Sequence, residues 1–78
     1  MYFVYLIQCG DGTLYTGIAK DVVRRFLEHQ AGKGARYTQA RKVVKVLYTE
    51  KYDSKSQALK REAQIKGWRR EKKLNLIK

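Results

Sequence analysis

Residues that carry redox, metal-binding or helix-breaking chemistry are scarce in this chain of 78 residues, which has no proline, one cysteine and one histidine. No disulfide can form within the chain, and Cys9 and His29 alone cannot build a structural zinc site. Cys9 stands beside a glycine turn with no basic pair next to it, which favours a strand-end residue over a nucleophile. This cysteine usage fits a reducing, cytoplasmic setting.

Long hydrophobic runs are also missing. No stretch approaches the roughly 18 consecutive apolar residues of a membrane-spanning helix, and residues 2–7 are too short, with no basic leader, for a signal peptide. We therefore expect no membrane association. Because so short a chain cannot bury two cores, we also expect a single domain over residues 1–78.

Acidic residues are few, with seven Asp and Glu against 18 Lys and Arg, giving a formal net charge of +11. Like charges at this density repel one another, and the polyanion that most often relieves such repulsion in proteins is nucleic acid. A basic protein that is merely soluble remains the alternative.

Three segments are predicted to be β-strands. Residues 2–7 and 14–18 are aromatic and β-branched, and Gly10-Asp11-Gly12 between them suits a tight turn, so they form a hairpin that places Tyr5 and Tyr15 across from each other. Residues 43–48, extending toward residue 52, supply a third strand. Three strands suffice for a small antiparallel sheet.

Three helices complete the predicted order β-β-α-β-α-α, an α/β sandwich with helices flanking the sheet. The first follows Asp21 as N-cap and spans about nine to eleven residues, and the second spans 55–66, opened by Ser54 with Gln57 in a capping-box spacing. A short third helix within residues 68–77 is expected to dock on the sheet through three apolar side chains, Trp68, Leu74 and Ile77.

Chemically versatile residues gather at a few places. Arg25 and His29 share one face of the first helix with Asp21, although a solvated face with an Asp21–Arg25 pair explains the spacing equally well. Tyr5 and Tyr15 are either site residues or core aromatics. Glu62 could hold a hard cation or simply pair with Lys66. An exposed cationic loop is predicted from four residues: Lys33, Arg36, Arg41 and Lys42.

These pieces together resemble a known pattern. Phe3-Val4-Tyr5, a turn and Tyr15-Thr16-Gly17 resemble the paired motifs of the GIY-YIG nuclease family, and three later residues match family positions, namely Arg25, His29 and Glu62. The likeness covers essentially the whole chain and is greatest to the small stand-alone bacterial members. The first motif lacks its glycine, and Asn75 matches a family asparagine only by rough spacing.

The resemblance implies metal-dependent hydrolysis of a phosphodiester bond in nucleic acid, with DNA the favoured substrate and repair or processing the expected setting. Glu62 would hold one Mg²⁺ or Mn²⁺, and Arg25 would contact the phosphoryl oxygens. Tyr5 and Tyr15 would orient and deprotonate the water, with Arg25, His29 and the metal favouring the phenolate. Gly17, read as a strand-end residue, would let the backbone approach the ligand, and the cationic loop would hold flanking phosphates.

Two other functions stay open at this point. The chain could be a binding module that keeps the fold and the basic surface without catalysis. It could also recruit a larger nucleic-acid-processing protein, in which case an exposed apolar patch should stand among the charges.

Overall fold

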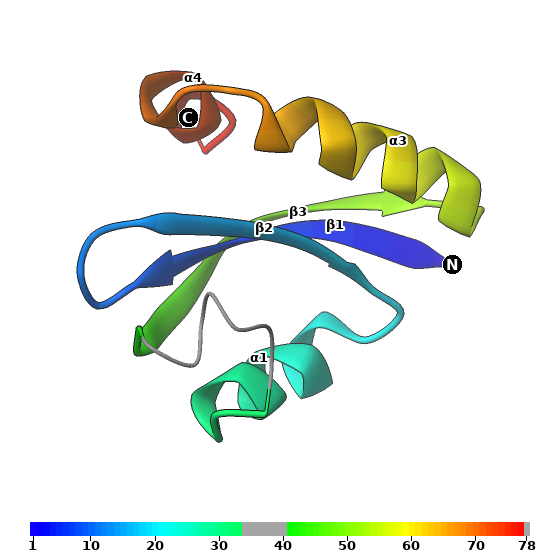
Figure 1. The fold of residues 1–78 in the computed structure, drawn as a ribbon. Coiled ribbons are helices and arrows are strands. Elements are labelled where there is room, and N and C mark those ends of the chain that lie inside the picture. The colour runs from blue at the N-terminus through cyan, green and yellow to red at the C-terminus, as the bar shows by residue number, and fades with distance from the viewer. Residues whose placement is uncertain (34–40, 78) are drawn as a thin grey trace.

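The computed structural model describes residues 1–33 and 41–77, which form an α/β sandwich. Three antiparallel strands, β1 (Tyr2–Cys9), β2 (Leu14–Ala19) and β3 (Val43–Tyr52), lie in the sheet order β2-β1-β3. Helix α1 (Val22–Gln30) covers one face, and α3 (Lys55–Lys66) with α4 (Arg70–Asn75) lies over the other (Figure 1). The predicted fold class and element order are confirmed.

The central strand β1 is buried on both faces, which explains its unbroken apolar sequence. On the α1 side Tyr5 and Ile7 form a core with Cys9, while on the α3 side Val4 packs with Ala58 and Ile65. Side chains alternate between the faces of a strand, so β1 supplies both cores. One consequence governs the site: Tyr5 and its odd-numbered neighbours face α1.

The hairpin turn forms where Asp11-Gly12 predicted it. Gly12 adopts φ +85°, and the Cys9 amide donates to the Thr13 carbonyl at 2.9 Å. Pairing places Tyr5 opposite Gly17 and Tyr15 opposite Ile7. The expectation that the two tyrosines face each other directly is therefore wrong by two residues, although both lie on the α1 face as diagonal neighbours.

The predicted starts of the first two helices, α1 and α3, are confirmed by their caps. The Asp21 carboxylate accepts from the Arg24 amide at 3.1 Å. Ser54 and Gln57 form the full capping box, each side chain bonding the other residue's backbone amide. These bonds satisfy amides that a helix leaves unpaired at its start, so both helices begin within a residue of the predicted positions.

The last helix is shorter than predicted and packs differently. Arg69 has extended backbone angles, φ −70° and ψ 159°, so Trp68 is not part of α4, which begins at Arg70. Trp68 packs on the second core as expected, but Leu76 accompanies it, while Leu74 is half-buried outside that core and Ile77 is exposed. In the described part of the chain, no helix has the length and apolarity to cross a membrane.

Candidate functional site

Tyr5, Tyr15 and His29 form an aromatic cluster between β1, β2 and α1. The ring centroids lie 6.3 Å apart for Tyr5 and Tyr15, 6.2 Å for Tyr5 and His29, and 5.2 Å for Tyr15 and His29. Tyr5 Oη lies 3.1 Å from His29 Nε2, within hydrogen-bonding distance. Both groups are 2% exposed, so this polar contact is made inside the protein.

Gly17 is the residue that lets Tyr5 take this position. A Cβ at Gly17 would lie 2.6 Å from Tyr5 Cζ and 3.1 Å from Tyr15 Cε2, so the Tyr5 ring crosses β2 where a side chain would stand. The expected place of Gly17 at a strand end is wrong, since it is buried in the middle of β2. The structure gives it a packing role, and its contact with nucleic acid stays a prediction.

Arg25 lies beside the aromatic cluster and is half-buried. Its Nη1 donates to Glu28 Oε1 at 3.2 Å, so the ion pair on this helix forms with Glu28 and not with Asp21. The guanidinium also interacts with the Tyr5 hydroxyl, strongly enough to affect the pKa of each group. Arg25 thus joins the cluster on the same face of the sheet.

Burial determines the protonation states in the aromatic cluster. Burial, helped by the nearby Tyr15, raises the pKa of Tyr5 to about 12 against the opposing effect of Arg25, so the hydroxyl is protonated in the protein without metal. A phenolate favoured by Arg25, His29 and a bound metal stays a prediction. Burial, then the Arg25 charge, lowers the pKa of His29 below its usual value. A neutral imidazole therefore lies against a protonated tyrosine.

Glu62 approaches the cluster from α3. It occupies the same helical stripe as Ala58 and Ile65, the buried residues of α3, and its side chain is only 16% exposed. Its charge contributes to raising the Tyr5 pKa, which places the carboxylate within electrostatic reach of that hydroxyl. Lys66 Nζ lies 3.5 Å from Glu62 Oε2, so the pairing considered as an alternative also forms.

A second half-buried carboxylate, Glu50 on β3, shows why Glu62 is the better cation ligand. Glu50 accepts from the Tyr48 and Tyr52 hydroxyls at 2.6 and 2.8 Å, and from Arg61 Nε and Nη2 at 2.9 and 3.1 Å. Its acceptor positions are therefore occupied by protein donors. Among residues 1–33 and 41–77, the one ion-pair partner of Glu62 is the Lys66 amine.

The donor set at Glu62 fits a hard divalent ion of low protein coordination. No group of three or more His, Cys, Asp or Glu side chains suited to a metal occurs among residues 1–33 and 41–77. Mg²⁺ often takes one or two carboxylates and completes its shell with water and substrate phosphate. The Glu62 carboxylate, with water and a substrate phosphate completing the shell, meets that requirement.

Of the predicted cationic loop, Lys33 and Lys42 are exposed, and Arg41 Nε donates to Asp11 Oδ2 at 2.9 Å, tying part of its charge to the hairpin turn. Arg36 lies outside the described residues. Asn75 is exposed on α4.

Two clefts contain cations that the sequence interpretation did not select. One, of about 250 Å³, lies directly beside Arg25 and is lined by Ala19, Lys20, Asp21, Arg24, Arg25 and Glu28. The other, of about 220 Å³, is lined by Thr13, Leu14, Arg70 and Lys73. The second cleft brings residues 13 and 14 together with residues 70 and 73, so spacing along the sequence could not have predicted it.

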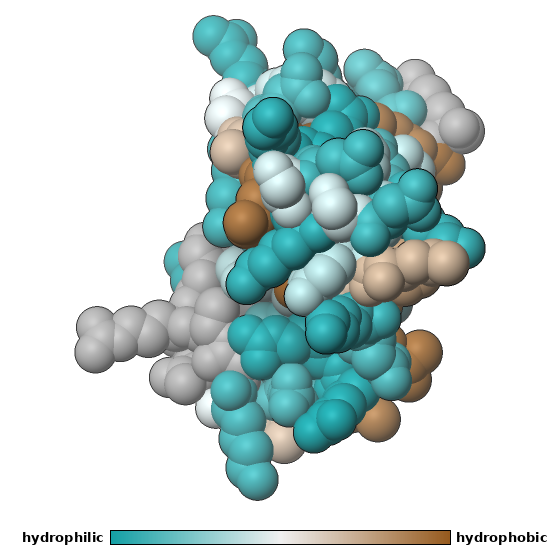
Figure 2. Space-filling model, turned by 90° about the vertical axis from the view of Figure 1, so that its right-hand side faces the viewer, coloured by the Kyte–Doolittle hydropathy of each residue, from teal (hydrophilic) through white to brown (hydrophobic). Residues whose placement is uncertain are grey.

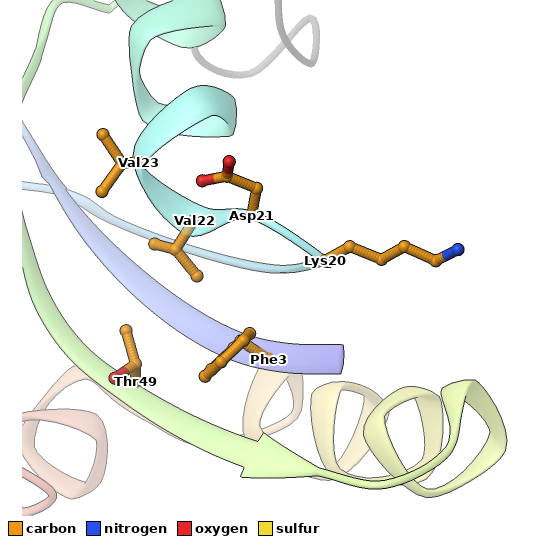
Figure 3. A pocket seen from close by; sticks show the side chains of 6 residues that line it. All are labelled: Phe3, Lys20, Asp21, Val22, Val23 and Thr49. Carbon is orange, nitrogen blue, oxygen red and sulfur yellow. The ribbon is translucent and has the colours of Figure 1, made fainter. Parts of the chain in front are cut away.

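A further cleft, of about 360 Å³, separates the start of α1 from the sheet. Phe3 and Val22 point toward each other across it, while the Lys20 side chain extends away (Figure 3). Thr49 lies on its β3 side. None of the candidate catalytic residues lines it.

Comparison with known proteins identifies the family. The family model described as the GIY-YIG catalytic domain matches residues 1–75. UPF0213 proteins of Staphylococcus aureus strains Mu3 and Mu50 are 54% identical over 77 residues, covering 99% of this chain and 94% of theirs. The solution NMR structure of the UPF0213 protein BH0048 from Bacillus halodurans superposes with a TM-score of 0.61 at 40% identity, covering 99% of this chain and 83% of that one.

Proposed function

Because the chain belongs to the GIY-YIG catalytic domain family, whose membership implies a nuclease-like function on nucleic acid, we propose that it is a metal-dependent endonuclease that hydrolyses phosphodiester bonds, with DNA as the favoured substrate. One observation carries the proposal: the Tyr5 hydroxyl interacts with His29, Arg25 and Glu62, which reach it from both helical layers. Phosphodiester hydrolysis needs this combination of a proton acceptor, a cation and a carboxylate.

In this proposal Glu62 binds the metal ion and Arg25 binds the phosphate. Glu62 would hold Mg²⁺ or Mn²⁺, which when bound stabilises negative charge on the phosphoryl group and the leaving oxygen. Arg25 binds the non-bridging phosphoryl oxygens, because its cleft is open and a guanidinium forms paired hydrogen bonds with phosphate. Glu28 keeps the Arg25 side chain oriented in the free protein.

Proton movement belongs to Tyr5 and His29. A water positioned by the Tyr5 hydroxyl adds through its oxygen to phosphorus, and the ester bond to the leaving oxygen breaks. Because the pKa of Tyr5 is near 12, Tyr5 relays a proton and does not act as a standing phenolate: its oxygen takes the proton of the attacking water as its own proton passes to the neutral His29 imidazole, 3.1 Å away. Solvent protonates the leaving alkoxide and takes back the proton held by His29, so the net change is addition of one water.

The decisive experiment compares Glu62→Gln with Glu71→Gln, an exposed residue of α4. Both variants lose one negative charge. On labelled single-stranded, duplex and branched substrates with Mn²⁺ or Mg²⁺, we expect cleavage by the wild type and by Glu71→Gln, and a loss of about 100-fold or more in Glu62→Gln with binding retained. A folded wild type that binds these substrates yet cleaves none of them with either metal overturns the proposal.

The raised pKa of Tyr5 favours one competing function, a binding module without catalysis, since a protonated tyrosine alone is a poor base. Such a module would bind equally well with and without metal. Metal-dependent cleavage abolished by His29→Gln, with affinity unchanged, excludes it.

A further inference from the structure

A cationic cleft lies at the hairpin end of β2, separate from the aromatic cluster. Thr13 comes from the turn, Leu14 from the start of β2, and Arg70 and Lys73 from α4. Leu14 directly precedes Tyr15 in β2, so the cleft begins one residue from the candidate active site. Arg70 also donates from Nη1 to the Gly12 carbonyl, which brings its guanidinium to the turn.

Within residues 1–33 and 41–77, no carboxylate forms an ion pair with the cations of this cleft. Lys73 is half-buried, and no carboxylate in the described part of the chain pairs with it. Burial and the nearby Lys66 ammonium both lower the Lys73 pKa. Cations gathered at one cleft destabilise the free protein, and a bound anion removes that cost.

Lys66 connects this cleft to the active site, because it contacts Glu62 on one side and lies close to Lys73 on the other. A second cleft containing Lys20, Arg24 and Arg25 lies where β2 ends at Ala19. The six residues of β2 thus run between two cationic clefts, a span of about 20 Å. Tyr15 lies between them, and the Tyr5 ring crosses β2 at Gly17.

We propose that Arg70 and Lys73 form a binding site for a backbone phosphate of the nucleic acid, so that the bound strand follows edge strand β2 from this cleft past Glu62 to Arg25. The assignment of the ligand rests on the proposed function, since it takes nucleic acid as the substrate. The site is sequence-independent, because it offers charge to phosphate and no groups arranged for base edges.

The test compares two double variants that each remove two positive charges. Arg70→Gln with Lys73→Gln alters the cleft, while Lys45→Gln with Lys51→Gln alters exposed residues of β3, the opposite edge of the sheet. Affinity for a short labelled oligonucleotide is measured across a salt series in EDTA, so that no cleavage occurs. We expect about tenfold weaker binding and a salt slope shallower by about one for the cleft variant, and at most about threefold weakening for the control.

Equal weakening in the two variants would overturn the site, because it would show that net charge alone matters. Circular dichroism and thermal melting verify folding, and Lys73→Arg, which keeps the positive charge, should retain most of the affinity that Lys73→Gln loses. Titration with inorganic phosphate adds a second arm: phosphate binding at Lys73 with unchanged oligonucleotide affinity also overturns the proposal. If the cleft variant binds like the control and the wild type still cleaves with metal, the phosphate site is wrong and the nuclease proposal stands. If only the cleft variant loses affinity and the wild type cleaves nothing, the phosphate site stands and the nuclease proposal is wrong.

Discussion

At the scale of single residues, burial determines which polar groups can take part in proton transfer. Tyr5, His29 and Thr16 are each 2% exposed. The first two face each other, and removal from water has shifted the pKa of Tyr5 upward and that of His29 downward, toward the uncharged form in each case. Transfer of the Tyr5 proton to His29 alone would create an ion pair in the interior, so it has to be coupled to the proton that Tyr5 takes from the attacking water.

His29 should make stability pH-dependent. Its pKa in the folded chain is lowered from about 6.5, so the unfolded chain binds more protons and stability falls as pH drops below about 6.5. Urea unfolding between pH 7.5 and 5 should show this loss in the wild type and a smaller one in His29→Gln, which retains the general effect of net charge. An NMR titration that gives His29 a pKa at or above 6.5 contradicts the prediction.

Thr16 faces the α3 side of β2, and no group in the described part of the chain bonds its buried hydroxyl. An unsatisfied hydroxyl costs stability, so Thr16→Val should raise the free energy of unfolding by about 1 kcal/mol. Thr49→Val, at an exposed position of β3, is the matched control and should have almost no effect. Destabilisation by Thr16→Val in urea would mean that the hydroxyl has a partner.

At the scale of elements, α3 is fastened to β3 by the Glu50 network. Arg61 bonds Glu50 through two nitrogens, and its guanidinium carbon lies 5.0 Å from the centre of the Trp68 ring, with Lys72 Nζ 4.5 Å from the same ring. Arg61 directly precedes Glu62 in the helix. The network therefore determines how α3 is rotated on the sheet, and with it where the Glu62 carboxylate points.

Glu50→Gln should lower the free energy of unfolding by about 2 kcal/mol, because Arg61 loses a charged partner in a half-buried setting. Chemical denaturation measures this directly. Glu71→Gln, on exposed α4, should change stability by less than about 0.5 kcal/mol. Equal stability of the two variants would show that the network contributes little to holding α3.

Elements were predictable here because their signals are local. Caps such as Asp21 and Ser54 act within four residues, and the apolar run of β1 identifies a strand. The wrong details depend on pairing or on backbone phase: the register that offsets Tyr5 from Tyr15, and the extended Arg69 that turns Ile77 to solvent. The Glu50 network joins β3 to α3 across eleven positions, beyond the reach of any spacing rule.

For the site, the resemblance named the residues and the fold explains their grouping. Tyr5, Arg25 and Glu62 come from three elements, and only the sandwich brings them together. Composition did not indicate their protonation states, because the Tyr5 pKa depends on burial. Gly17 was selected for an approach to the ligand, which stays a prediction, and the structure shows another reason for a glycine there, the passage of the Tyr5 ring.

At the scale of the whole molecule, the net charge of +11 spreads over a body with principal extents of 29 × 26 × 20 Å. Hydrophilic residues cover most of the face in Figure 2, with hydrophobic side chains in scattered patches. Some apolar residues are exposed, including Val23 and Leu27 on α1. Besides this general charge, cations gather in the two clefts at the ends of β2, where we propose that the nucleic acid strand binds.

Binding to nucleic acid should weaken steeply as salt is raised. If the two clefts and Lys66 engage about five phosphates, the logarithm of the affinity for duplex DNA should fall against the logarithm of salt concentration with a slope of about −4.5, and for single strands about −3.5, because each contact releases condensed counterions. Fluorescence anisotropy on both substrates, in EDTA, measures the two slopes. Similar slopes for unrelated sequences are expected, since phosphate contacts carry no base information. A slope near zero, or affinity for one sequence only, would mean that base recognition and not the charge along β2 holds the nucleic acid. Either result would contradict both the proposed path of the strand along β2 and the inference from net charge.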